Sequence, residues 1–176
     1  MSSVLGLDRG RWRTVVSGWE LTFERRLRHP PARVWQALTT PTGLRAWLAA
    51  AEIEPRAGGR MYLRFEQTAV DDFPDTEEMR QQRNEILTWR PFTLFEHSFG
   101  GPDSIVSWRL ASAENGTHLT LVHCVPRRWE SDLPRTLSGW HHHLERLSGS
   151  LLDQHRAWDW RRWKELRTAY TKEMER

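Results

Sequence analysis

The longest regular helical pattern in the chain is Pro134-Arg-Thr-Leu-Ser-Gly-Trp-His-His-His-Leu-Glu-Arg-Leu-Ser-Gly-Ser-Leu-Leu152. Its large apolar residues recur at steps of three or four, which places them on one face of a helix. Upstream, from Trp19 to Cys124, apolar and polar residues mostly alternate, as in strands with one buried face. We therefore expect a curved sheet that wraps around a late helix whose apolar stripe is Leu137, Trp140, Leu144, Leu147 and Leu151.

About seven strands are predicted before this helix, from alternating or short apolar segments between turn residues. Asn115-Gly116 favours a tight hairpin turn between the last two. Gln67–Arg83 is polar and is predicted to be an extended loop or short helix. The predicted strands are Trp19–Leu27, Ala51–Pro55, Arg60–Glu66, Glu85–Arg90, Thr93–Phe99, Ser104–Leu110 and Thr117–Cys124.

Two short helices are predicted after the first of these strands. Pro30 and Pro31 suit a helix entry, because the first turn has backbone donors to spare. Thr40 is a plausible cap for the second helix, which carries Leu44, Trp47 and Leu48. Both helices are too short to be stable alone and must pack on the sheet or the long helix.

The chain divides into three parts. Residues 1–18 are polar and rich in Arg, and we expect an arm with a short strand at Arg13–Val16. Residues 19–153 form the predicted domain, and residues 154–176 a Trp-rich helical C-terminal extension. We expect a break near Trp158–Trp160 and a second helix that folds back, because one continuous helix would leave three Trp side chains without a partner surface.

Size and charge restrict the class of protein. A chain of 176 residues suits one domain with a sizeable core. The net charge is only +3 and the Arg clusters have acids close by, which argues against a nucleic-acid-binding face. Cys124 is the only cysteine, so a reducing compartment is expected, and no apolar run approaches the roughly 20 residues of a membrane span. These features predict a cytoplasmic protein.

Several motifs identify a family. Arg28-His-Pro-Pro-Ala-Arg-Val-Trp-Gln-Ala-Leu-Thr39 resembles the opening motif of the START-like superfamily, also called SRPBCC or Bet v 1-like. Thr40-Pro-Thr-Gly-Leu-Arg-Ala-Trp47 resembles the motif that follows it. Gly58-Gly59, Gly116-Thr117 and Gly139-Trp140 match later landmarks in order. Together they resemble the branch of the activator of heat-shock protein 90 ATPase homologues, in its stand-alone bacterial-type form.

The resemblance covers roughly Trp19 to Leu152 and implies an α+β helix-grip fold, with an apolar cavity between the sheet and the last helix. Family members bind lipids or other hydrophobic small molecules, some cyclise or dehydrate polyketides, and some contact a chaperone. Binding of a hydrophobic or aromatic small molecule is therefore our first hypothesis. The alternatives are a polyketide cyclase- or hydratase-like enzyme with a cavity histidine as acid–base, and a chaperone-type protein-binding module or homodimer that uses Trp158, Trp160 and Trp163. We expect no cofactor, since no phosphate loop or nucleotide fingerprint is present.

The side chains that face inward from the predicted strands and the long helix are the candidates for lining the cavity. His123 shares its strand face with Leu119 and Leu121, and a reference pKa near 6.5 would suit acid–base chemistry. The reading we favour is a structural histidine held by a hydrogen-bond partner, because no orienting acid lies nearby in sequence. His143 is the second catalytic candidate. The residues predicted to line the cavity are Phe65, His97, Trp108, Leu121, His123, Trp140, His143, Leu144 and Leu147.

The run His141-His142-His143 resembles a metal motif, but its geometry argues against one. Consecutive helical residues point about 100° apart, so the three rings cannot converge on one ion. His142 lies opposite the apolar stripe and is expected to be solvated. His141 lies four residues before Glu145, a pairing that predicts a surface position. We therefore predict no metal site.

Overall fold

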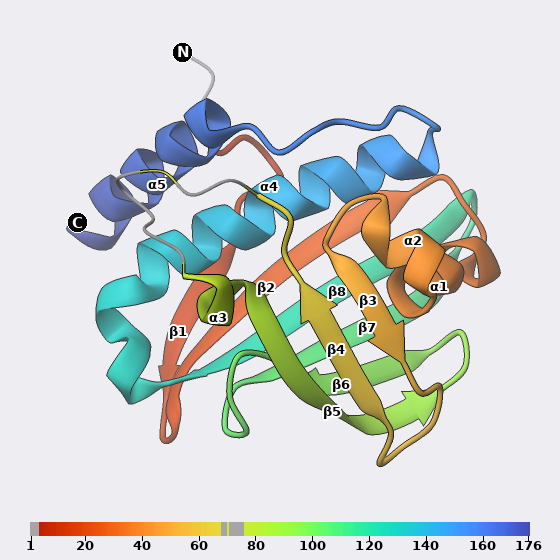
Figure 1. Cartoon of the computed structure of the whole chain (residues 1–176). Coiled ribbons are helices and arrows are strands. Elements are labelled where there is room, and N and C mark those ends of the chain that lie inside the picture. Colours follow the sequence, from red (N-terminus) through yellow and green to blue (C-terminus); the bar gives the residue numbers. More distant parts are fainter. Residues whose placement is uncertain (1–3, 68–69, 71–75) are drawn as a thin grey trace.

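The computed structural model describes residues 4–67, 70 and 76–176. Within this part of the chain, eight strands form one curved antiparallel sheet beneath the long helix (Figure 1), in the order β1-β2-β8-β7-β6-β5-β4-β3. The α+β helix-grip prediction is confirmed. The strands are β1 Arg11–Val15, β2 Gly18–Leu27, β3 Ala50–Ile53, β4 Arg60–Arg64, β5 Gln81–Arg90, β6 Leu94–Ser98, β7 Ile105–Ala113 and β8 Gly116–Pro126.

The helices follow the predicted order. The long helix α4 spans Leu133–Leu151 and follows a 3-10 turn, η1, at Arg127–Asp132. Thr40 caps α2 as expected, because its Oγ1 accepts a hydrogen bond from the backbone N–H of Gly43 at 3.0 Å. The other helices are α1 Pro31–Thr39, α2 Pro41–Arg45, α3 Glu77–Arg80 and α5 Trp160–Met174.

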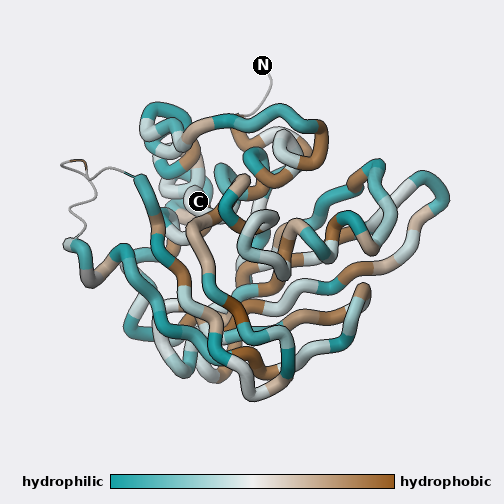
Figure 2. The backbone as a smooth tube through the Cα atoms, turned by 45° about the vertical axis from the view of Figure 1, so that its right-hand side comes forward, coloured by the Kyte–Doolittle hydropathy of each residue, from teal (hydrophilic) through white to brown (hydrophobic). Residues whose placement is uncertain are grey.

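The apolar stripe of α4 is buried in the core together with the inward side chains of the strands. Leu137 and Leu147 are fully buried, and Trp140 packs edge-on against Trp108 of β7 with ring centroids 5.6 Å apart. Hydrophobic stretches recur along the strands and the facing helices, while the hairpin ends are mostly hydrophilic (Figure 2). The alternation in the sequence therefore corresponds to one buried and one solvated sheet face.

The N-terminal segment adds a strand to the predicted sheet. β1 covers most of the expected Arg13–Val16 strand and pairs antiparallel with β2, which raises the strand number from about seven to eight. Sequence alternation is weak there because β1 is an edge strand whose side chains are mainly exposed. The Gln67–Arg83 segment was expected to be an extended loop or short helix. The short helix α3 agrees with this expectation, whereas Gln81–Arg83 belong to the start of β5; residues 68–69 and 71–75 lie outside the description.

The chain breaks after α4, as expected, and returns as α5 (Figure 1). Asp153 adopts a left-handed conformation with φ of 55°, which turns the chain at the end of α4. α5 packs on α4, and the Tyr170 hydroxyl accepts a hydrogen bond from the backbone N–H of Gly10 at 2.7 Å. The two ends of the chain are thus joined over the long helix.

The β7–β8 hairpin generates a stability prediction. Its turn is Glu114-Asn115, one residue before the expected position, and Gly116 has a φ of +151°, where a Cβ would overlap the carbonyl oxygen of Leu27. Gly116→Ala should therefore lower the free energy of unfolding by about 2 kcal/mol or more, measured by urea denaturation.

The matched control is Gly139→Ala, inside α4, where a Cβ would meet no atom within 4 Å. Since alanine is the better helix former by about 1 kcal/mol, this variant should be unchanged or more stable. Equal stability of the two variants would contradict the account of Gly116.

Candidate functional site

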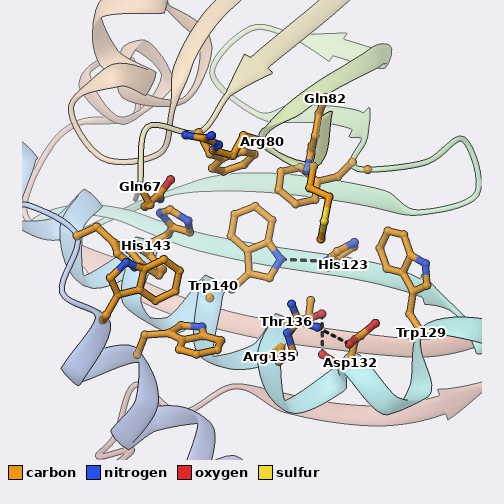
Figure 3. A pocket seen from close by; sticks show the side chains of 18 residues that line it. Gln67, Arg80, Gln82, His123, Trp129, Asp132, Arg135, Thr136, Trp140 and His143 are labelled. Atoms are coloured by element: carbon orange, nitrogen blue, oxygen red, sulfur yellow. Dashed lines mark hydrogen bonds and ion pairs between the residues drawn. The ribbon is translucent and has the colours of Figure 1, made fainter. Parts of the chain in front are cut away.

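A cavity of about 330 Å³ lies beside α4 (Figure 3). Its walls come from β8, the ends of β4–β6, the η1–α4 segment and the C-terminal extension. Most of the wall is aromatic, which suits a flat apolar guest. The aromatic and histidine side chains that line the cavity are Phe65, Phe99, His123, Trp129, Trp140, His143, Trp158, Trp160 and Trp163.

Polar side chains also reach this cavity. In Figure 3, Asp132, Arg135 and Thr136 lie on one side of Trp140, and His143 and Gln67 on the other. Arg135 and Asp132 form an ion pair with an N–O distance of 3.0 Å. The start of α4 therefore contributes an ion pair to a wall that is otherwise largely aromatic. Arg80 and Gln82 complete its polar lining.

Four of the nine predicted cavity residues line the cavity: Phe65, His123, Trp140 and His143. The others lie outside its lining and are fully buried in the packed core, because Trp47 of the α2 region fills the space beside Trp108 with ring centroids 5.7 Å apart. These core residues are His97, Trp108, Leu121, Leu144 and Leu147.

His123 is held at both ring nitrogens. Its Nδ1 accepts a hydrogen bond from the indole N–H of Trp140 at 2.9 Å, so the neutral ring carries its proton on Nε2. Nε2 lies 2.7 Å from Oγ of Ser104 and donates to it. Burial, with a smaller effect of His97, lowers the pKa of His123 to about 3. This histidine joins α4 to the sheet and has no nitrogen left for a ligand.

His97 is held in the same way. Its Nδ1 donates to the carbonyl oxygen of Ser98 at 2.8 Å, and its Nε2 accepts from the indole N–H of Trp108 at 3.1 Å. Burial lowers its pKa to about 4. Two Trp–His pairs, Trp140–His123 and Trp108–His97, therefore satisfy each other's ring nitrogens in this aromatic core.

His143 differs from these two because only one of its nitrogens is used. Nδ1 lies 3.1 Å from the backbone carbonyl oxygen of Trp47, which can only accept, so Nδ1 carries the proton. Burial, together with the positive charge of Arg146, lowers the pKa of His143 to about 3. The neutral ring therefore exposes an unprotonated Nε2 on the side chain that lines the cavity.

The expected surface positions of His141 and His142 are wrong. Both are buried, because α5 and the segment before it cover this side of α4. The Tyr170 hydroxyl lies 2.8 Å from Nδ1 of His141, and Nε2 of His142 accepts a hydrogen bond from the backbone N–H of Asp159 at 3.0 Å. Periodicity identified the helix face correctly but could not show that another helix packs on it.

Glu145 ties the extension to α4. Nδ1 of His142 donates to one of its carboxylate oxygens at 3.0 Å, and Arg162 of α5 contacts the other at 2.6 Å. Although burial acts in the opposite direction, the hydrogen bonds from His142 and Arg162 hold the pKa of Glu145 at about 2. A charged carboxylate therefore bridges the two helices.

The extension supplies lining residues that the sequence analysis did not assign to the cavity. Trp158, Trp160 and Trp163 were considered as a partner surface, but all three line the cavity, and Trp163 is fully buried. Trp129 and the charged residues Arg80, Asp132 and Arg135 were also missed. The density of Trp in the tail was the available signal, but only the return of the chain brings it to α4.

Within residues 4–67, 70 and 76–176, no group of three His, Cys, Asp or Glu side chains is arranged to hold a metal ion. The helices of the same residues include none long and apolar enough to cross a membrane.

The model of the family "Activator of Hsp90 ATPase homolog 1-like protein" matches residues 28–151. The chain belongs to this family. The match begins directly after β2, includes α1 to β8 and all of α4, and stops before the extension that carries Trp158. No curated protein sequence matches the chain at a significant level.

Solved structures share the family's fold. EF2215 from Enterococcus faecalis, a conserved protein of unknown function, has a TM-score of 0.73 at 17% identity, covering 94% of this chain and 90% of that one. CalU16 from Micromonospora echinospora has a TM-score of 0.69 at 21% identity, covering 97% of each chain. DynU16, a protein in the dynemicin biosynthetic locus, has a TM-score of 0.60 at 23% identity, covering 76% of this chain and 47% of that one.

The Trp140–His123–Ser104 chain of hydrogen bonds generates a prediction. Ser104→Ala leaves the buried Nε2–H of His123 without its acceptor and should lower the free energy of unfolding by about 1–3 kcal/mol. Ser112→Ala, at an exposed position of β7, is the control and should change it by no more than about 0.5 kcal/mol. Chemical denaturation of both variants measures the difference, and equal stabilities would contradict the proposed contact.

The buried histidines predict a pH dependence. The folded-state pKa values of His97, His123, His141 and His143 lie near 3 to 4, below the reference of about 6.5. Below pH 6.5 the unfolded chain therefore binds protons that the folded chain does not. The free energy of unfolding should fall as the pH drops from 6.5 toward 4, by up to about 1.4 kcal/mol per pH unit for each histidine.

Urea titrations at several pH values measure this slope. His143→Gln removes one of the titrating groups, so its slope should be shallower than that of the wild type. A wild-type stability that stays constant between pH 7 and 5 would contradict the neutral, buried state of these rings.

Proposed function

We propose that this protein binds a hydrophobic or aromatic small molecule in the cavity beside α4. The observation that carries the proposal is a cavity of about 330 Å³ whose wall is formed largely by Trp, Phe and His rings. Large rings held in a packed core offer a preformed apolar surface, so little ordering free energy opposes binding. Membership of the family supports the proposal, since the resemblance to this family implied an apolar cavity between the sheet and the last helix.

We further propose that residues 154–176 are an extension of the domain at 19–153 and act as one wall of the binding site. In support, Trp158, Trp160 and Trp163 line the cavity although they lie beyond the family match. His142 and Glu145 of α4 contact Asp159 and Arg162, which keeps this wall in place. The extension would thus adapt a common fold to its own ligand.

The histidines favour binding over acid–base catalysis. His123, the first catalytic candidate, has both nitrogens in hydrogen bonds to Trp140 and Ser104. His143 has a free Nε2, but its pKa of about 3 makes it a weak base at neutral pH. A cyclase- or hydratase-like reaction would need another proton acceptor in the cavity.

A chaperone-type or self-associating partner surface has less support. The reason for that hypothesis was the set of Trp side chains in the extension, and these lie against α4 and the cavity instead of forming an exposed patch.

We also propose a cytoplasmic location. The free Cys124 supports it, since a single cysteine forms no bridge within the chain.

Native mass spectrometry of gently purified protein tests the binding proposal and reports the oligomeric state in the same measurement. We expect a retained small molecule, or a rise in melting temperature with members of a panel of aromatic compounds, because a ligand stabilises the state that binds it. Absence of both a retained mass and any thermal shift would overturn the proposal.

Gly139→Leu tests the location. Gly139 lines the cavity, and a Cβ there would meet no atom within 4 Å, so a leucine side chain should extend into the space that the ligand needs. The variant should fold at least as stably as the wild type and lose the thermal shift with aromatic compounds. Gly139→Ala, which adds one methyl group, should weaken binding less. Undiminished binding by Gly139→Leu would place the ligand elsewhere.

A further inference from the structure

His143 presents a hydrogen-bond acceptor to the cavity. Its Nδ1–H is committed to the carbonyl oxygen of Trp47 at 3.1 Å, which leaves the lone pair of Nε2 as the only free polar site of the neutral ring. Nε2 has no hydrogen-bond partner among the residues that the structure describes. The side chain is only 8% exposed, and it lines the cavity.

The surroundings of this acceptor are aromatic. The rings of Phe65, Trp140 and Trp158 lie with centroids 6.0, 6.3 and 4.6 Å from that of His143. None of these rings offers the acceptor a hydrogen bond in the structure. An acceptor in such an apolar wall loses hydration when a ligand fills the cavity, unless the ligand itself donates a hydrogen bond.

His123, the other histidine of the cavity wall, cannot accept a hydrogen bond from a ligand. His123 meets Trp140 and Ser104 with its two nitrogens and so offers nothing to a guest. The carbonyl oxygen of Trp47 also accepts a hydrogen bond from Nη1 of Arg146, which lies on α4 like His143, at 2.8 Å. This carbonyl keeps a donor even when the His143 ring is replaced, so the site can be altered without leaving a buried group unpaired.

We propose that the ligand is a flat, largely apolar molecule carrying a hydroxyl or N–H group, and that this group donates a hydrogen bond to Nε2 of His143. The inference rests on the proposed binding function and narrows it to a chemical class. A hydroxylated aromatic compound meets both requirements, since its rings match the Trp and Phe wall and its hydroxyl matches the free Nε2 of His143. A molecule of the same shape without a donor leaves the acceptor desolvated and unpaired, which is the basis of discrimination by polar groups.

A pair of probes isolates the donor. 2-Naphthol and 2-methoxynaphthalene have the same ring system, but the methyl ether cannot donate a hydrogen bond. The ether is the more hydrophobic, so apolar burial alone would favour it. We expect the wild-type protein to bind 2-naphthol about three- to tenfold more tightly, as one net hydrogen bond provides. Isothermal titration calorimetry measures both affinities.

His143→Phe is the matched variant, because it keeps a ring of similar shape and removes the acceptor. It should bind the two probes in the reverse order or equally. A preference for 2-naphthol that persists in His143→Phe would overturn the assignment to His143. Equal affinities in the wild-type protein would overturn the inference while leaving the binding function intact, whereas binding of neither probe to the wild type would count against both.

A second readout needs no substitution. In the 15N NMR spectrum of the wild-type protein, the resonance of the unprotonated Nε2 of His143 should move upfield on addition of 2-naphthol, because accepting a hydrogen bond shields this nitrogen. 2-Methoxynaphthalene should leave it nearly in place, and the nitrogen resonances of His123 should change little with either probe. A bound 2-naphthol that leaves the His143 resonance unmoved would overturn the inference.

Discussion

The hydrogen bond from the Trp140 indole to Nδ1 of His123, continued by His123 to Ser104, joins the long helix to the middle of the sheet through fully buried atoms. All three groups are removed from water, so each must keep its partner or carry the cost of an unpaired polar group. This requirement fixes the rotation of α4 over the sheet. Once it is fixed, Gly139 and His143 face the cavity, and Leu137 and Leu147 fill the core.

The opposite side of α4 obeys a different constraint. His141, His142 and Glu145 are polar, yet α5 and the segment before it cover them. Their burial is tolerated because Tyr170, Asp159 and Arg162 supply matching donors and acceptors. The same contacts hold the Trp side chains of the extension at the cavity. A family fold that ends with α4 is thereby completed by residues from outside the family match.

The buried histidines of this core differ in whether a ring nitrogen is left free to bind a ligand. His97 and His123 each pair with a Trp indole and with a second partner, so burial leaves them neutral and saturated. His143 is equally neutral, but its Nε2 remains open toward the aromatic cavity. A neutral imidazole with one free lone pair suits the recognition of a donor group better than proton transfer, since its pKa of about 3 makes protonation costly at neutral pH.

The order of elements could be predicted from the sequence, because strand and helix periods appear directly in it: α4, the Thr40 cap and the break before α5 were all expected. Parity also assigned Trp140 and His123 to the inner face. Only the tertiary structure decided three other features. These are the burial of His141 and His142, the tautomer of each histidine, and the position of Trp158, Trp160 and Trp163 at the cavity. Periodicity determines which way a side chain points, whereas its burial and proton position depend on partner atoms such as the Trp47 carbonyl, 96 residues from His143.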